Sequence, residues 1–244
     1  MTLYISVWSD VACPWCYVGK RRLETALKTV ARGKYASTEI KIEWKSFELD
    51  PRKDHDYGDE VYMHRLAKKY GTSEAQAQDM IDRMSKTGAE EGLAFDFETA
   101  IAANTFDAHR LLQLAKVLDE KGKTKGMQGE MKELFLRAHF EEGADIASHE
   151  TLVRLAGEAG LDVDKASAVL ASDDFSQEVR DDIEEAQMLS ITGVPFFAIG
   201  RFAVQGAQQA NTLADLIEKS IKEENTDVLA EDEISDDLCL PDGC

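Results

Sequence analysis

The chain has few cysteines, few cations and no long hydrophobic run. Its 244 residues include only 28 Lys and Arg against 47 Asp and Glu, which gives a formal net charge of −19. Binding to nucleic acid or to an anionic membrane requires a basic surface, so this charge argues against both kinds of partner. The sequence also has no run of about 18 apolar residues that could span a bilayer. This composition favours a soluble protein.

The first residues, MTLYISVWSD, lack the features of a secretory leader. They contain no basic segment, no long apolar segment and no cleavage site of small residues. We therefore expect a cytosolic protein. Because the cytosol is reducing, cysteines there are more often catalytic or metal-binding than part of structural disulfides. The four cysteines form two pairs, Cys13 with Cys16 and Cys239 with Cys244, at opposite ends of the chain.

Hydrophobic patterning predicts a strand–helix–strand unit in the first fifty residues. Residues 3–8 form a short apolar run typical of a buried strand. Residues 13–30 repeat apolar side chains at helical spacing, and Pro14 suits the first turn because its missing N–H would have no helical partner there. Residues 39–47 alternate apolar and charged side chains, as a strand does. The first cysteine pair therefore opens a helix directly after a strand.

The middle of the chain shows only helical periods, separated by glycines and capping residues. Ser73, with Gln76 three residues later, is a helix start signal, and so is Asn104 ahead of a long apolar-periodic stretch. After residue 190, β-branched and aromatic residues surround Gly200 and predict strands at 196–199 and 202–204. A helix at about 209–223 follows, with an apolar stripe.

These segments predict an α/β core interrupted by a large helical insertion. We divide the chain into a first core part (1–57), the insertion (58–190), a second core part (191–222) and a C-terminal tail (223–244). The tail contains nine acids and no Lys or Arg, a composition typical of a solvated, mobile extension.

The Cys-x-x-Cys motif at residues 13–16 is compatible with several kinds of chemistry. Covalent haem attachment requires a His after the second Cys, and Tyr17 excludes it. The two cysteine pairs have spacings that permit a zinc site, although zinc knuckles usually lie on glycine-containing turns rather than at the start of an amphipathic helix. A structural disulfide across so short a loop gains little entropy by closure, and the cytosol disfavours it.

Thiol–disulfide exchange explains the motif more fully than the other three. The thiolate is the nucleophile, and the free N–H groups and partial positive charge of a helix N-terminus favour the thiolate of Cys13. Cys16 lies one turn further along, where it can attack a mixed disulfide on Cys13. Pro14 and Trp15 set how oxidising the resulting disulfide is. A partly exposed Trp15 would help to hold unfolded chains.

Val194 and Pro195 form a second candidate site segment, just before a predicted strand. A cis bond would bring this segment up to the cysteine pair and leave the backbone groups of Val194 free to bind an extended substrate. The residues alone favour a trans proline that begins an edge strand, because only about 5% of X–Pro bonds are cis.

Two polar residues complete the candidate site. Asp10 is either a proton acceptor beside the thiols or a turn acid that binds local N–H groups. His109 lies in the helix that begins near Asn104, and a lone His in a helix is usually packed or hydrogen-bonded. The other histidines show no metal spacing, so we expect no metal site among them and place them at the surface or partly buried: His55, His64, His139 and His149.

Together these motifs resemble the DsbA-like thioredoxin-fold family, in particular its cytosolic FrnE-like branch, which is related to the 2-hydroxychromene-2-carboxylate isomerases. The resemblance covers roughly residues 2–222. It is carried by Asp10-x-x-Cys13-Pro14-Trp15-Cys16, Asn104-Thr105-Phe106-Asp107-Ala108-His109-Arg110, Gly193-Val194-Pro195-Phe196-Phe197 and Val204-x-Gly206-Ala207-Gln208. The acidic tail ending in Cys239-x4-Cys244 is similar to an extension of that branch.

The resemblance implies a thioredoxin-like fold, protein disulfide oxidoreductase and isomerase activity, a cis bond at Pro195, and a His109 that faces the thiols. We expect no cofactor. The expected partners are unfolded or disulfide-bearing proteins and a thioredoxin or glutathione system that recycles the enzyme in the cytoplasm. Since an extended tail of about twenty residues can span up to ~70 Å, we also expect Cys239 and Cys244 to form a second redox pair that exchanges with the first.

Two alternatives stay open at this point. A zinc-binding or redox-sensing interaction protein would use the tail as its switch. A glutathione-dependent isomerase of the 2-hydroxychromene-2-carboxylate type would share the fold, but such relatives generally carry Ser where this chain has Cys13. The presence of both cysteines favours dithiol chemistry.

Overall fold

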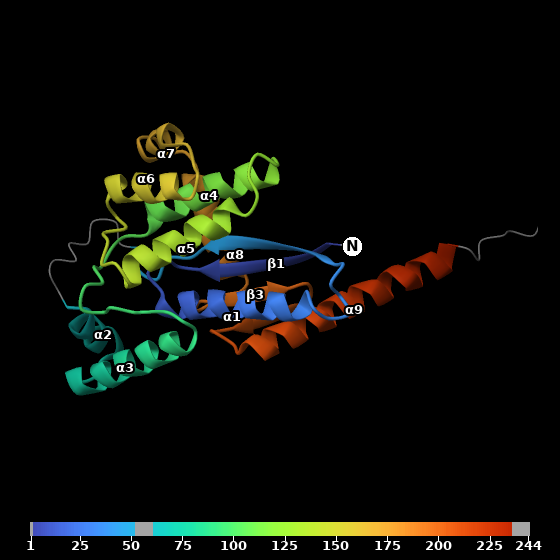
Figure 1. The fold of residues 1–244 in the computed structure, drawn as a ribbon, viewed down its shortest axis with the longest axis horizontal. Helices are drawn as coiled ribbons and strands as arrows, with labels where there is room; N and C mark the ends of the chain where they lie inside the picture. The colour runs from blue at the N-terminus through green and yellow to red at the C-terminus, as the bar shows by residue number, and fades with distance from the viewer. Residues whose placement is uncertain (1, 52–60, 236–244) are drawn as a thin grey trace, which may run out of the picture.

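The computed structural model describes residues 2–51 and 61–235 and shows a mixed β-sheet with helices on both faces (Figure 1). Within these ranges the sheet has four strands in the order β2-β1-β3-β4. The strands are β1 (Thr2–Ser9), β2 (Glu39–Ser46), β3 (Phe196–Ile199) and β4 (Phe202–Gln205). β1 pairs with β2 in parallel and with β3 antiparallel, and β3 and β4 form a hairpin. All four predicted strands are confirmed, as is the turn at Gly200, whose φ of +52° suits glycine.

Nine helices occupy the rest of the described residues. They are α1 (Pro14–Val30), α2 (Tyr62–Tyr70), α3 (Glu74–Glu90), α4 (Phe106–Glu120), α5 (Met127–Phe140), α6 (His149–Glu158), α7 (Val163–Leu170), α8 (Ser176–Met188) and α9 (Ala210–Ser235). The predicted start signals are confirmed. Ser73 and Gln76 form a capping box on α3, and the side chain of Asn104 accepts the backbone N–H of Phe106 at the start of α4.

The two faces of the sheet are covered by different helices. On one face, Leu3, Ile5 and Val7 of β1 pack against apolar residues of α1 and α9. On the other face, Trp8 packs against Ala186 of α8 and donates its indole N–H to the backbone of that helix. Each fully buried aliphatic side chain contributes roughly 1.5–3 kcal/mol. The sheet therefore holds α1, and with it the first cysteine pair, in a fixed position.

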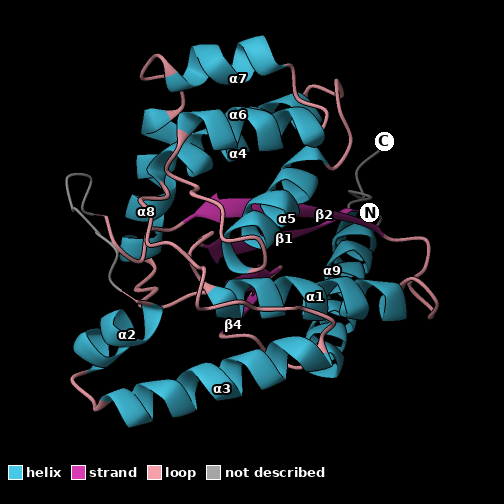
Figure 2. Ribbon diagram, turned by 60° about the vertical axis from the view of Figure 1, so that its left-hand side comes forward, coloured by secondary structure: helices cyan, strands magenta, loops and turns pink. Residues whose placement is uncertain are grey.

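The helical insertion packs on α1 from two sides. α2 and α3 meet α1 and α5 in a cluster that includes Tyr17, Val18 and Phe140. α4 to α7 build a second cluster around residues such as Leu111 and Phe135. Figures 1 and 2 show α2 and α3 on the opposite side of α1 and α5 from α6 and α7. The start of α1 is thus bordered by the insertion.

The last helix is longer than the sequence predicted. We expected it to end near Glu223, but α9 continues to Ser235 and projects away from the body of the molecule (Figure 1). The acidic segment that follows Glu223 contains Glu, Ala and Leu, which are good helix formers. Three residues named from the sequence lie outside the described residues: His55, Cys239 and Cys244.

Candidate active site

The first cysteine pair lies at the start of α1, just after the short loop that follows β1. Cys13 is the N-cap of α1 and has extended backbone angles, φ −108° and ψ 110°. Its carbonyl accepts the N–H groups of Cys16 at 3.0 Å and Tyr17 at 3.4 Å, which closes the first helical turn. Both thiols are free. The free N–H groups of this turn and the helix dipole favour negative charge at Cys13.

The two thiols differ in their surroundings. Burial and the neighbouring Cys13 thiol raise the pKa of Cys16 well above 9.0. Cys16 exposes 1% of its surface and Cys13 exposes 4%. Both cysteines are therefore buried, Cys16 slightly more than Cys13. The Cys13 Sγ donates to the Val194 carbonyl at 3.6 Å.

Val194 and Pro195 lie against the cysteine pair, as predicted. The bond between them is cis, as the resemblance implied, and the trans alternative is wrong. The Pro195 ring sits on Gly19 of α1: a Cβ at Gly19 would lie 2.9 Å from Pro195 Cγ. The absence of a side chain at Gly19 therefore lets this loop reach Cys13.

Asp10 and His109 form a buried pair beneath the thiols. His109 Nε2 lies 3.4 Å from Asp10 Oδ1. Burial acts to raise the pKa of the Asp10 carboxyl, but the hydrogen bonds from His109 and from the Leu49 backbone, together with the positive charge of Lys132, outweigh burial and hold that pKa below 3.8. Burial dominates for His109 and holds its pKa below 6.5. At neutral pH an Asp10 carboxylate thus faces a neutral imidazole, which donates its N–H.

The local turn role of Asp10 is confirmed, and its role as a proton acceptor for the thiols stays a prediction. Its carboxylate accepts the N–H of Ala12 at 3.3 Å and of Leu49 at 2.8 Å, which is the local turn role. The same carboxylate contacts His109, and the backbone of Asp10 donates toward the Cys16 sulfur, which stabilises the thiolate. His109 contacts Asp10, and a direct role of His109 at the thiols stays a prediction.

Lys132 is a buried cation that sequence reasoning missed. It lies on α5 with no exposed surface, and its Nζ donates to the Ser9 carbonyl at 3.4 Å. Burial lowers the pKa of Lys132 to about 8, although attraction to Cys16 and Asp10 acts in the opposite direction. A positive charge here favours a thiolate on Cys16. The signal in the sequence was a Lys within an apolar stripe of a helix.

Two further residues near the site were not predicted. Tyr62 of α2 has a raised pKa, first because of burial and second because of the charge of Cys13 close by. His139 of α5 was expected at the surface or partly buried, and this is wrong. His139 exposes 2% of its surface, and burial lowers its pKa to about 4. By contrast, His64 and His149 are exposed and pair with Glu74 and Asp107.

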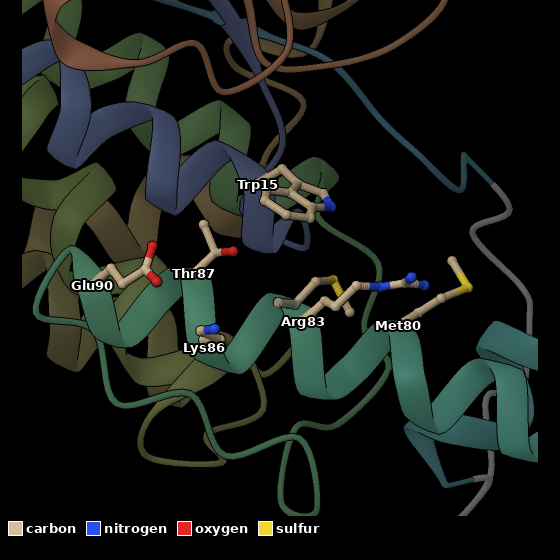
Figure 3. Close-up of a pocket in the computed structure, with 7 residues that line it drawn as sticks. Trp15, Met80, Arg83, Lys86, Thr87 and Glu90 are labelled. Atoms are coloured by element: carbon tan, nitrogen blue, oxygen red, sulfur yellow. The ribbon is translucent and has the colours of Figure 1, made fainter.

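Trp15 is 38% exposed, so its predicted partial exposure is confirmed. It overhangs a hollow of about 440 Å³ between the start of α1 and one face of α3 (Figure 3). The other lining residues all come from α3: Met80, Arg83, Met84, Lys86, Thr87 and Glu90. The insertion therefore supplies one wall of a groove whose other wall is Trp15, the residue that lies between the two cysteines in the sequence.

The described part of the chain offers neither a cluster of metal ligands nor a helix that could span a membrane. There, no three His, Cys, Asp or Glu side chains lie close enough together to hold a metal ion. A site built from all four cysteines would need Cys239 and Cys244, which are not described. Among the same residues, no helix has the length and hydropathy needed to cross a bilayer.

A four-stranded sheet with a Cys-x-x-Cys helix and a facing cis-Pro loop defines a thioredoxin-fold protein with a dithiol site. The chain belongs to the DsbA-like thioredoxin domain family, whose model matches residues 4–218. It is 38% identical to a probable DsbA oxidoreductase from Streptomyces coelicolor, with a TM-score of 0.77 and 91% of each chain covered.

Two other proteins resemble the chain less closely in sequence. The uncharacterized protein YwbO of Bacillus subtilis is 28% identical over 225 residues, which are 92% of this chain and 98% of YwbO. The cytosolic disulfide reductase DsbM of Pseudomonas aeruginosa shares the fold, with a TM-score of 0.54, 18% identity, and 93% and 100% of the two chains covered.

Proposed function

We propose that this chain is a thiol–disulfide oxidoreductase of protein substrates, in which Cys13 attacks and Cys16 resolves. The observation that carries the proposal is the asymmetry of the pair. Both thiols are buried, but Cys13 caps α1 beside the Val194 carbonyl, whereas Cys16 lies one turn further in and has a raised pKa. An attacking thiolate and a protonated resolving thiol are what exchange requires.

Exchange proceeds in two balanced steps. The Cys13 thiolate attacks one sulfur of a substrate disulfide, the substrate S–S bond breaks, and the second substrate sulfur leaves and takes up a proton. Cys16 then loses its proton and attacks Cys13, which forms the Cys13–Cys16 disulfide and releases the remaining substrate sulfur. The substrate gains two electrons, and the reverse sequence oxidises a dithiol. The Lys132 ammonium and the Asp10 backbone N–H stabilise the Cys16 thiolate in the second step.

The proposal includes a finer assignment to the cytosolic FrnE-like branch, with isomerase activity on disulfide-bearing proteins and with thioredoxin or glutathione as the recycling reductant. It is supported by the motif at residues 104–110, which includes His109, and by the acidic tail with its second cysteine pair. The cytosolic DsbM shares the fold and is described as a disulfide reductase, which is compatible with a cytoplasmic location. Retention of Cys13 supports dithiol chemistry over glutathione-dependent isomerisation.

Reduction of insulin by a thiol reductant tests the dithiol assignment. Cys13→Ser should abolish catalysed reduction, because no nucleophile remains at the start of α1. The matched control is Cys239→Ser, which removes a cysteine far from α1 in sequence and should retain a measurable rate. Full activity in Cys13→Ser would remove this mechanism.

We also propose that Cys239 and Cys244 exchange with Cys13 and Cys16 as a tethered second dithiol. A tethered partner acts at high effective concentration, so it accelerates transfer without new contacts. The double variant Cys239→Ser/Cys244→Ser should slow regeneration of the first pair by one or more oxidants or reductants and leave the melting temperature of the core unchanged. Stopped-flow Trp fluorescence measures the regeneration rate. Unchanged kinetics with every redox partner tried would contradict this part of the proposal.

A further inference from the structure

The hollow beneath Trp15 has the shape of a groove rather than a round pocket. Met80, Arg83, Met84 and Thr87 follow the i, i+3, i+4, i+7 spacing of one helix face, and Lys86 and Glu90 extend it. From Met80 to Glu90 this face is about 15 Å long at 1.5 Å per residue. An extended polypeptide rises about 3.3 Å per residue, so roughly four substrate residues fit along it.

The groove has an apolar floor. Met84 is buried with 5% of its surface exposed, and Trp15 forms the opposite wall with 38% exposed. Met80 lies half-buried beside them. Methionine side chains adapt to irregular partners, and an indole offers a large apolar contact area. The floor therefore suits an apolar side chain of varied shape.

The rim of the groove carries two cations, Arg83 and Lys86, and one carboxylate, Glu90, so its net charge is positive although the protein is strongly acidic. Arg83 and Lys86 are exposed and make no ion pair or hydrogen bond with any residue in the described part of the chain. Both project from the face of α3 that carries the groove (Figure 3). In a chain with a net charge of −19, these two free cations are a local exception that attracts carboxylates.

We propose that this groove binds the segment of a protein substrate next to its reactive cysteine, and that it selects an extended stretch with an apolar side chain and an Asp or Glu within about four residues of that cysteine. The inference rests on the proposed function, because Trp15 lies between Cys13 and Cys16 and ties the groove to the dithiol. The apolar side chain packs on Trp15, Met80 and Met84. The carboxylate binds Arg83 and Lys86.

Two disulfide-linked peptide dimers test the selection. Both carry the same cysteine and the same neighbouring Leu, and they differ only in two Glu residues that are replaced by Lys in the second peptide. With dithiothreitol as reductant at low salt, kcat/KM for the Glu peptide should exceed that for the Lys peptide about tenfold, the expectation for two ion contacts of ~0.7 kcal/mol each. The ratio should shrink as salt is added.

Charge-reversal variants assign the preference to the groove. Arg83→Glu/Lys86→Glu should invert the ratio, and both positions are exposed, so the fold is retained. The matched control Lys121→Glu/Lys123→Glu makes the same change in net charge at exposed positions after α4 and should leave the ratio as it is in the unsubstituted protein. A third peptide with Ser in place of Leu should be reduced more slowly by every protein tested.

Other outcomes separate failure of the inference from failure of the proposed function. Equal reduction of the Glu and Lys peptides by the unsubstituted protein would overturn the inference and leave the oxidoreductase assignment intact. If charge reversal changed the reduction of oxidised glutathione but not that of the peptides, the inference would also be overturned, since the groove would then bind a small disulfide rather than a protein segment. Absence of any peptide or insulin reduction would overturn the proposed function itself.

Discussion

Lys132 is the residue whose placement is hardest to explain by stability. A fully buried ammonium group costs free energy, and its pKa is lowered to about 8 for that reason. Its direct hydrogen bond is to the Ser9 carbonyl, and it lies close to Cys16 and Asp10. A charge that is costly to bury and adjacent to reacting groups is typical of a functional site. We interpret Lys132 as a positioning residue that stabilises the Cys16 thiolate.

Replacing Lys132 with Met should raise the stability of the protein at pH 7 and lower its activity. The folded-state pKa of about 8 lies below the ordinary 10.5. Burying the charged ammonium group therefore lowers the free energy of unfolding by its full amount below pH 8. This destabilisation disappears as the pH rises to 10.5. Lys132→Met should be more stable than the unsubstituted protein at pH 7, by on the order of 3 kcal/mol, and this gain should vanish toward pH 10.5. Urea unfolding at several pH values measures it.

The same variant should resolve mixed disulfides about tenfold more slowly near pH 7, as expected if the Cys16 pKa rises by about one unit. Single-turnover exchange with a disulfide peptide measures this rate. Lys132→Arg keeps the charge and serves as the conservative variant. A Lys132→Met protein that is less stable at pH 7 and resolves at the normal rate would contradict the role of Lys132.

Sequence reasoning found the site residues that lie within local motifs. Cys13, Cys16 and Asp10 are close together in the chain. Pro195 was found separately, from the Gly193-Val194-Pro195-Phe196-Phe197 motif. Lys132 could not be found in this way, because its position depends on how α5 docks against β1: its contact with Ser9 spans 123 residues. The only indication in the sequence is a lysine within the apolar stripe of a helix.

At the scale of elements, the contact between α1 and the cis-Pro loop controls the shape of the site. A Cβ at Gly19 would approach Pro195 Cγ to 2.9 Å and Phe197 to 3.2 Å. Gly19→Ala should therefore move the loop away from Cys13. We expect a loss of about 1–3 kcal/mol in the free energy of unfolding from overpacking, together with slower exchange.

Gly129→Ala is the matched control for this prediction. Gly129 lies inside α5, and a Cβ there would meet Trp44 only at an ordinary 3.5 Å. Since Ala is the better helix former, this change should stabilise the protein by up to about 1 kcal/mol and leave exchange unchanged. Denaturant unfolding and insulin reduction measure both variants. If Gly19→Ala were also stabilised and reduced insulin at the normal rate, the contact between α1 and the cis-Pro loop would not control the shape of the site.

Most elements were predictable because each has a clear period. The alternation in β2 predicted that strand close to its observed bounds, and the capping box predicted where α3 begins. The end of α9 was not predictable in the same way. Its acidic composition suggested a mobile tail from Glu223, whereas its helix-forming residues continue the helix to Ser235.

On the scale of the whole molecule, the site is made where the insertion meets the sheet. α1 presents Cys13, the β3 loop presents Val194, α2 presents Tyr62, and α3 supplies the wall of the groove. Periodicity in the sequence identified the insertion as helical, but not which of its helices would lie beside the thiols. Docking of helices depends on long-range packing, which no local pattern encodes.

The most direct test of the proposed mechanism is to map the mixed disulfide that Cys13 forms with a substrate. In Cys16→Ser the resolving thiol is absent, so a mixed disulfide with a disulfide-bearing peptide should accumulate. Peptide mapping by mass spectrometry should find one substrate peptide per chain, linked to Cys13, and the adduct should be absent from Cys13→Ser/Cys16→Ser. No adduct at Cys13, or an adduct through Cys239 or Cys244 alone, would contradict the claim that Cys13 at the start of α1 is the attacking thiol.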